Sequence, residues 1–310
     1  MAQVYILLAA YNGAAFVRQQ VDSILGQTFS DFRLILSDDG STDGTPDLLE
    51  SLAREHPDRI THYRSGQRFG CAQSHFMHLL QQFRQSRYIM FCDQDDVWHP
   101  DKIEKTLAAI KALEGSPAVP ALVHTDLRVV DGALQETAPS FCRLSNLDGN
   151  RTGLNRLIVQ NVVTGCTVMV NRALADIACR KPITEKLLMH DWWLAILAAA
   201  VGKVGFVDEA TIDYRQHGNN SVGAKNTRSL AYLWKRLTAG DTRKVLVSTA
   251  LQAQLFLSYY GDLLSPFQQT LLGDFARTAH APKLTRLRIY RKHRIFKYGF
   301  LRVLAQIIGG

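Results

Sequence analysis

The feature that most constrains the fold is an alternation, over the first 113 residues, of short apolar runs with longer amphipathic segments. The apolar runs are typical of buried strands and the amphipathic segments of helices, and their alternation is the signature of βαβ units around a mostly parallel sheet. The pattern predicts strands at residues 4–9, 32–37, 60–64 and 88–92, and helices at residues 14–25, 45–55, 71–83 and 100–113. The predicted fold class is α/β and Rossmann-like. Ligands of such sheets bind where the strands end.

Beyond residue 120 the pattern becomes mixed, and after about residue 225 it is helical only. It predicts strands at residues 121–130, 162–171, 204–207 and 211–215, and helices at residues 154–160, 190–201, 230–237, 244–260, 266–278 and 283–308. The best boundary lies at residues 218–227. We therefore predict a catalytic domain over residues 1–224 and a helical, basic C-terminal region over residues 225–310.

Charge is distributed unevenly along the chain, which carries 36 Lys+Arg against 28 Asp+Glu and 46% hydrophobic residues. Eight of the basic residues lie from Lys283 onward, where there is no acid, so residues 1–282 are formally neutral. The composition excludes a disordered chain. Five widely spaced cysteines without a CxxC pair argue against a secreted disulfide framework, and the N-terminus lacks the basic start of a signal peptide. The longest apolar run, Trp192–Val201, is too short to cross a bilayer, so a cytoplasmic protein is expected.

Two acidic segments follow predicted strands. In ILSDDGSTDGT (residues 35–45), a carboxylate at the strand end can accept hydrogen bonds from a nucleobase or a ribose, and Asp39 is the candidate. Helix capping is the alternative role for this segment, and it suits Asp43. In YIMFCDQDDVWHP (residues 88–100), Asp93, Asp95 and Asp96 lie within four residues. Carboxylates this close repel unless a cation compensates them, and a divalent ion completed by diphosphate oxygens would do so; a solvated acidic loop is the alternative.

Four motifs together resemble a known family. AAYNG (residues 9–13), DDGSTDGT (38–45), DQDDVWHPDKI (93–103) and HDWW (190–193) occur in the order found in family 2 inverting glycosyltransferases of the GT-A fold. DQDDVW, HDWW and YRQHGNN (214–220) are most similar to the bacterial rhamnosyltransferase branch. The resemblance covers roughly residues 3–224, about 70% of the chain.

The resemblance implies a nucleotide-sugar site at the strand ends. By it, Ala9, Tyr11 and Asn12 line the nucleotide pocket and Asp39 contacts the base, while Asp93 lies near the ribose and the metal. Arg68 stands where the family often has Asn, and an Arg there can pair with donor phosphate.

The resemblance also implies a metal. Asp95 is the expected ligand of a divalent ion, Mg²⁺ or Mn²⁺, with Asp96 in support. His217, in the YRQH context, is a second expected contact to metal or phosphate; a surface histidine is the alternative.

Asp191 matches the catalytic base of the family. Inverting transfer needs one carboxylate that takes the proton of the acceptor hydroxyl, although an Asp at the start of a helix can also be a cap. Gly165 matches a segment on the acceptor side. Trp192 could stack on a sugar, but an aromatic residue at the start of an apolar helix is more often core.

The basic stretch of residues 283–308 interleaves bases with apolar residues and is typical of an interfacial helix on anionic lipid. Packing on the catalytic domain and nucleic-acid binding are the alternatives, and no nucleic acid is expected. The sequence thus predicts a metal-dependent enzyme, peripheral at the inner face of the membrane, that moves a sugar, rhamnose from dTDP-rhamnose on branch resemblance, to a hydroxyl of a lipid-linked or cell-surface glycan. A UDP-hexose donor, a nucleotidyltransferase and a non-catalytic nucleotide-sugar-binding protein are the alternatives.

Overall fold

The computed structural model describes residues 2–183, 187–217 and 241–309. Within them, nine strands form one sheet in the order β3-β2-β1-β4-β8-β6-β9-β5, with β7 paired to β6. The strands are β1 (Val4–Ala10), β2 (Phe32–Asp38), β3 (Ile60–His62), β4 (Tyr88–Asp93), β5 (Val97–Trp98), β6 (Ala121–Val130), β7 (Glu136–Ala138), β8 (Met169–Asn171) and β9 (Lys203–Arg215). Strands β1 to β4 pair in parallel, as predicted, and the remainder of the sheet is mixed.

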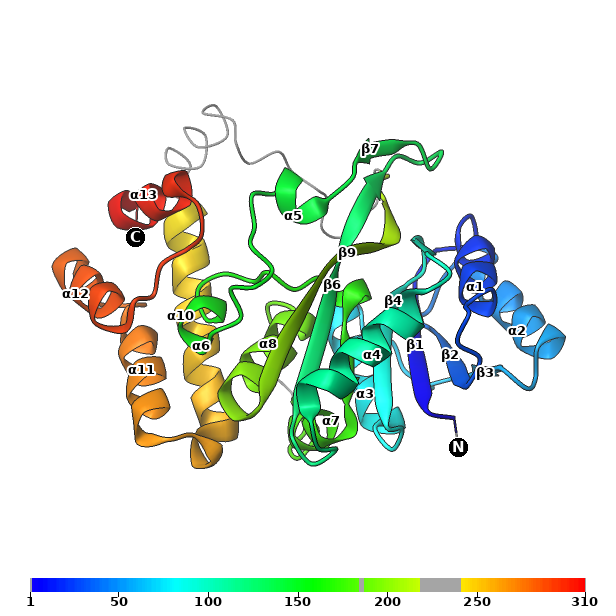
Figure 1. Ribbon diagram of the computed structural model, residues 1–310, viewed down its shortest axis with the longest axis horizontal. Coiled ribbons are helices and arrows are strands. Elements are labelled where there is room, and N and C mark those ends of the chain that lie inside the picture. Colours follow the sequence, from blue (N-terminus) through cyan, green and yellow to red (C-terminus); the bar gives the residue numbers. More distant parts are fainter. Residues whose placement is uncertain (1, 184–186, 218–240, 310) are drawn as a thin grey trace.

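Helices cover both faces of this sheet (Figure 1). Successive side chains of a strand point to opposite faces, so Ile6 and Leu8 of β1 pack on one face and Leu7 on the other. The first face is covered by α1 (Val17–Leu25), α2 (Thr45–Glu55) and α4 (Lys102–Glu114), and the second by α3 (Ala72–Phe83), α7 (Arg172–Ala178) and α8 (His190–Val201). Burial on both faces explains why β1 and β4 are apolar without alternation.

Two predicted strand boundaries in the second half were wrong. Residues 204–207 and 211–215 belong to one strand, β9, whose pairing with β6 shifts register beside Asp126. Of the strand predicted at residues 162–171, only Met169–Asn171 forms a strand, which is β8. Gly165–Thr167 forms the short helix η1. The Thr167 amide and hydroxyl both bond the Thr164 carbonyl, which closes a turn that apolar periodicity does not reveal.

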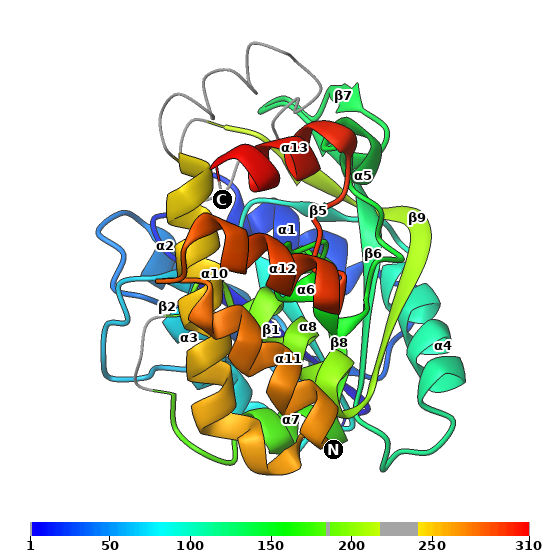
Figure 2. The ribbon, with the colours of Figure 1, turned by 90° about the vertical axis from the view of Figure 1, so that its left-hand side faces the viewer.

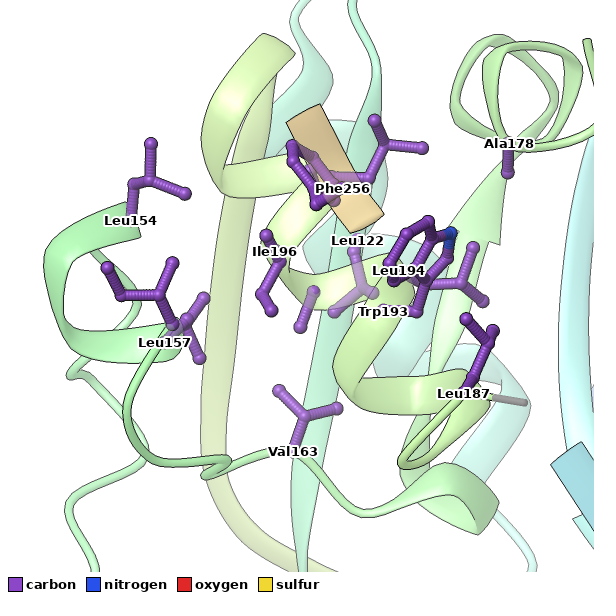
Figure 3. Packing of buried hydrophobic residues seen from close by; sticks show 14 of the residues in the cluster. Leu122, Leu154, Leu157, Val163, Ala178, Leu187, Trp193, Leu194, Ile196 and Phe256 are labelled. Carbon is purple, nitrogen blue, oxygen red and sulfur yellow. The ribbon is translucent and has the colours of Figure 1, made fainter. Parts of the chain in front are cut away.

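The C-terminal helices continue the core of the sheet. These are α10 (Asp241–Tyr260), η2 (Gly261–Leu263), α11 (Pro266–Arg277), α12 (Lys283–His293) and α13 (Phe300–Gly309), gathered at one end of the molecule (Figure 1). Trp193 of α8 is fully buried, meets the rings of Phe256 and Tyr260 of α10, and lies in the cluster drawn in Figure 3. The helix predicted at residues 230–237 lies outside the described residues.

The single helix predicted at residues 283–308 is instead two helices, α12 and α13, which face the viewer in Figure 2. Arg294 takes a left-handed conformation with φ +54°, and the Ile295 amide bonds back to the Tyr290 carbonyl at 2.9 Å, which ends α12. The apolar residues of the stretch serve two surfaces, because Ile289, Tyr290 and Ile295 are buried whereas Leu284, Phe300 and Ile308 are exposed. In the described part of the chain, no helix combines the length and apolarity that crossing a membrane requires.

Candidate active site

The donor side of the site is a set of loops after β1, β2 and β4 that are tied together by side chains. Asn12, with φ +50°, receives the Thr42 amide on its side-chain oxygen, and its own amide donates to the Ser41 hydroxyl. The Gln94 side chain accepts a hydrogen bond from the Tyr11 amide at 2.7 Å and donates one to the Tyr11 carbonyl at 2.9 Å. Three motifs distant in sequence are therefore held as one surface at the carboxyl edge of the sheet.

The two acids of this edge that the sequence distinguished, Asp39 and Asp43, both accept backbone amides, and the N-cap of α2 is Gly44 rather than Asp43. Asp39, 5% exposed, accepts the amides of Phe69 and Gly70, the latter at 2.8 Å. Asp43 accepts the amide of Thr45 at 3.0 Å, at the start of α2, and that of Ala14 at 3.1 Å. Asp43 thus stabilises the helix start and joins it to the first loop.

Arg68 and Tyr11 contact each other beside these loops. The Arg68 guanidinium donates to the Tyr11 hydroxyl at 2.9 Å and lies over its ring, 5.2 Å from the centroid. Its aliphatic part passes Gly40, whose φ of +79° favours glycine. Ala9 lies at the end of β1, paired with Asp93 of β4, so the two expected nucleotide residues are neighbours.

The DQDD motif places two carboxylates against a buried thiol. One ligand atom from each of Asp93, Asp96 and Cys166 lies within 4.8 Å of the others. Burial, followed by the charges of Asp95 and Asp191, raises the pKa of Asp93 to about 7. Burial and the charge of Asp93 also raise the pKa of Asp96 well above its ordinary value. Such a cluster of oxygens, crowded and desolvated, fits a divalent cation.

Asp95 and His217, expected from the sequence to share a metal, are in contact. His217 Nε2 lies 2.7 Å from Asp95 Oδ2, and the His217 ring stacks on Phe16 at 4.7 Å. Arg215 holds this corner together: its side chain donates to the Asp95 carbonyl at 2.9 Å, and its amide donates to Asp96 Oδ1 at 3.3 Å. The corner joins the end of β9 to the end of β4.

Asp191 begins α8 on the other side of the cluster. It is 3% exposed, and burial raises its pKa to about 7 against the opposing hydrogen bonds from the Trp192 and Gly165 backbone and the Asn161 side chain. The charge of Asp191 contributes to the raised pKa of Asp93, so the two carboxylates lie within electrostatic range of each other. A carboxylate with a pKa near neutrality is suited to accept and release a proton.

Gly165 and the two tryptophans have separate roles. A Cβ on Gly165 would lie 2.9 Å from His190 Nε2 and 3.6 Å from Asp191 Oδ2, so glycine permits η1 to approach the start of α8. Trp192 is half-buried and donates its indole N–H to the Leu157 carbonyl. Trp193 is fully buried in the core, which is the commoner role of an aromatic residue at the start of an apolar helix.

Three residues of this site were missed from the sequence: Gln94, Arg215 and Asn161. Gln94 and Arg215 lie inside recognised motifs, and their polar side chains beside buried strand ends were a signal that could have found them. Asn161 lies in no motif. Its contact with Asp191 spans 30 residues of sequence, so only the fold reveals it.

Comparison with known proteins gives the family. Residues 5–177 match the domain described as Glycosyl transferase family 2. This chain belongs to that family. A dTDP-rhamnosyl transferase, RfbG of Shigella flexneri, is 29% identical over 239 residues, which cover 74% of this chain and 78% of RfbG. The chain is therefore a glycosyltransferase.

Solved structures support the same fold. TarS of S. aureus (residues 1–349) has a TM-score of 0.59 at 15% identity, over 90% of this chain and 71% of TarS. The mannosyltransferase PcManGT of Pyrobaculum calidifontis, solved with GDP-Man and Mn²⁺, has a TM-score of 0.56 at 16% identity, over 99% of this chain and 85% of that protein. This family 2 glycosyltransferase thus has the GT-A fold with C-terminal helices, as the motifs implied.

Proposed function

We propose that this glycosyltransferase moves rhamnose, with inversion, from dTDP-rhamnose to a hydroxyl of a lipid-linked or cell-surface glycan. The observation that carries the proposal is the buried Asp191 in the first turn of α8, within electrostatic range of Asp93 at the carboxyl end of β4. Support for the donor comes from RfbG, which bears the name of a dTDP-rhamnosyl transferase.

Asp191 is the proposed base. The acceptor hydroxyl attacks the anomeric carbon from the face opposite the diphosphate, its proton passes to Asp191, and the bond to the leaving dTDP breaks. Inversion follows from a single displacement. A pKa of about 7 suits this role, because the carboxylate is ionised above neutral pH and still basic enough to hold a proton.

The donor is held by the loops after β1, β2 and β4. Asp39, with Arg68 and Tyr11 beside it, would bind the nucleoside, and Ala9 and Asn12 shape the first loop. The cluster of Asp93, Asp96 and Cys166 fits a divalent ion, Mg²⁺ or Mn²⁺. Asp93 is one proposed ligand, and Asp95, with His217 in contact with it, is proposed as the other side of the ion's site. When bound, such an ion would neutralise charge on the departing diphosphate. PcManGT was solved with Mn²⁺ and a nucleotide sugar, which supports this assignment.

The test of the base is Asp191→Asn, assayed with dTDP-rhamnose and a glycan acceptor. We expect transfer to fall by about 10²–10⁴-fold, the usual contribution of a general base, while dTDP affinity by calorimetry stays unchanged. Wild-type transfer by the variant would refute the mechanism. A donor panel that includes UDP-GlcNAc, the sugar nucleotide solved with TarS, tests the donor separately.

We also propose that α12 and α13 hold the enzyme at the cytoplasmic face of an anionic membrane. Leu284, Phe300 and Ile308 are 72%, 79% and 52% exposed, a large apolar area for surface helices. The exposed bases of the same stretch are Lys283, Arg288, Arg291 and Arg294, besides Lys292, which pairs with Asp274. Apolar side chains next to bases suit a bilayer interface that carries negative charge.

Sedimentation with vesicles of phosphatidylglycerol and phosphatidylcholine tests this contact. Wild-type protein should bind, less strongly at high salt, and Phe300→Ser with Ile308→Ser should bind weakly. Leu263→Ser, an exposed apolar position in η2 at the far end of α10, is the control. Equal sedimentation of the double variant and wild type would refute the contact. If residues 283–310 were a detached tail, their removal would test the membrane contact. Tyr290 and Ile295 of this stretch lie in the core, so their removal would also disturb the fold.

A further inference from the structure

Asn161 lies between α6 (Leu154–Leu157) and η1 and contacts the catalytic helix. Its side-chain Nδ2 donates to Asp191 Oδ1 at 3.3 Å. The other end of the amide, Oδ1, accepts the Val163 amide at 3.0 Å. Since the Val163 N–H can only donate, this second bond fixes which end of the Asn161 amide faces Asp191.

The segment that carries Asn161 is attached to the C-terminal region. Residues 145–160 and 293–302 are joined by a series of side chain to backbone bonds, of which the nearest to Asn161 is from the Tyr298 amide to Gln160 Oε1, at 2.6 Å. The others are Asn155 Nδ2 to the His293 and Arg294 carbonyls, Arg151 to the Phe296 carbonyl, and Arg302 to the Ser145 and Asn146 carbonyls. Arg151 also lies over the Tyr298 ring, at 5.3 Å.

We propose that Asn161 is a positioning residue of the transfer step, which holds the Asp191 carboxylate in one orientation, and that residues 293–302 hold Asn161 in place through Gln160. The inference rests on the proposed role of Asp191 as the base. It makes the C-terminal region part of the machinery on the acceptor side.

The surroundings of Asp191 explain why one hydrogen bond matters there. Burial raises the pKa of Asp191, and the charge of Asp191 in turn raises the pKa of Asp93 at the end of β4. Burial keeps His190, on the same helix, neutral by lowering its pKa to about 3. Hydrogen bonds from the Trp192 and Gly165 backbone and from the Asn161 side chain favour the ionised carboxylate, and among the described residues Asn161 is the side chain that donates to it. Loss of the Asn161 donor should therefore raise the pKa of Asp191.

The experiment compares Asn161→Ala with Asn155→Ala, two asparagines of one segment. We expect N161A to lower kcat about tenfold, the usual cost of removing a group that orients a reactive one, and to leave dTDP affinity unchanged. The acid limb of its kcat/KM profile should move up by about half to one pH unit. N155A loses bonds to the C-terminal region only, so its acid limb should not move.

Two further variants make the result decisive. Asn161→Asp keeps the size of the side chain and adds repulsion, so its acid limb should move further up than that of N161A; it also serves if N161A does not fold. Gln160→Ala removes the bond to Tyr298 and should change kcat in the same direction by a smaller factor.

A lower thermal midpoint in N161A and N161D with wild-type kcat and an unmoved acid limb would overturn the proposal and leave Asn161 a structural residue. Failure of the proposed function would look different, because Asp191→Asn would then retain transfer. An inactive D191N beside a wild-type N161A refutes only the positioning role.

Discussion

The donor side and the base side of this active site are built in different ways. On the donor side, loops 9–14, 38–45 and 93–96 follow adjacent strands and bond to one another through Asn12, Gln94 and Asp43. On the base side, Asp191 depends on η1, on the segment before it and, through Gln160, on a stretch more than 100 residues away. The donor side can therefore be recognised motif by motif, whereas the base side exists only in the assembled fold.

This difference has a physical origin. Parallel strands β1, β2 and β4 bring their carboxyl ends to one edge, so motifs that follow them meet by topology. No comparable rule joins residues 145–161 to residues 293–302. Their contact depends on how α10 and α11 pack against α8 and how α12 packs against α11, which is determined by the shape of the buried surface.

The largest expected effect is on stability at the base side. A folded-state pKa of about 7 for Asp191, against a usual value near 4, means that the native protein binds more protons than the unfolded chain between these values. The stability contribution of this group is therefore lost as pH rises from about 4 to 7, by up to about 4 kcal/mol.

Asp191→Asn removes this penalty, so we expect the variant to be more stable than wild type at pH 8 and closer to it at pH 5. Chemical denaturation at the two pH values measures the difference. An equal difference at both values would contradict the raised pKa.

On the donor side, Asp95→Ala should lower Mn²⁺ affinity by about a hundredfold, because it removes a proposed ligand. Mn²⁺ binding followed by electron paramagnetic resonance, without donor or acceptor, measures this directly. Asp58→Ala, an exposed acid just before β3 at the opposite edge of the sheet, is the matched control. Unchanged Mn²⁺ affinity in D95A would exclude Asp95 as a ligand.

Substitutions at two glycines, Gly13 and Gly165, should each disturb one side of the site and leave the other unchanged. A Cβ on Gly13 would lie 2.2 Å from Gln94 Oε1, and a Cβ on Gly165 would lie 2.9 Å from His190 Nε2. Gly13→Ala should raise the KM for the donor about tenfold, and Gly165→Ala should lower kcat about tenfold with donor KM unchanged, since each displaces one side only. Steady-state kinetics with varied donor distinguishes them. The same kinetic change in both variants would show that the two sides move together.

The fold shows that the basic residues responsible for the net charge lie on packed helices. The last 28 residues carry the whole formal excess, but they do not form a detached basic helix. Lys292 pairs with the buried Asp274 at 2.8 Å, and Arg302 bonds the carbonyls of the segment at residues 145–146. The remaining exposed bases are the ones available to a membrane surface.

The sequence alone determined the first half of the fold and most of the donor side. Apolar runs and turn motifs are local, so the sequence could predict strands β1, β2 and β4 and the acidic segments that follow them. The roles of Asp39 and Asp43 stay predictions; Asp95 and His217, predicted to share a metal, lie in contact. Asp191 was predicted as the base in the same way, from HDWW, and that role stays a prediction.

Only the tertiary structure decided how that base is held. The turn at Gly165, the break at Arg294 and the contact of Asn161 with Asp191 depend on close approach between distant segments. Apolar periodicity reports which side chains avoid water, but it does not report which buried surface they meet. For this protein, the motifs therefore predict the candidate catalytic residues, and only the packing shows which residues hold them in place.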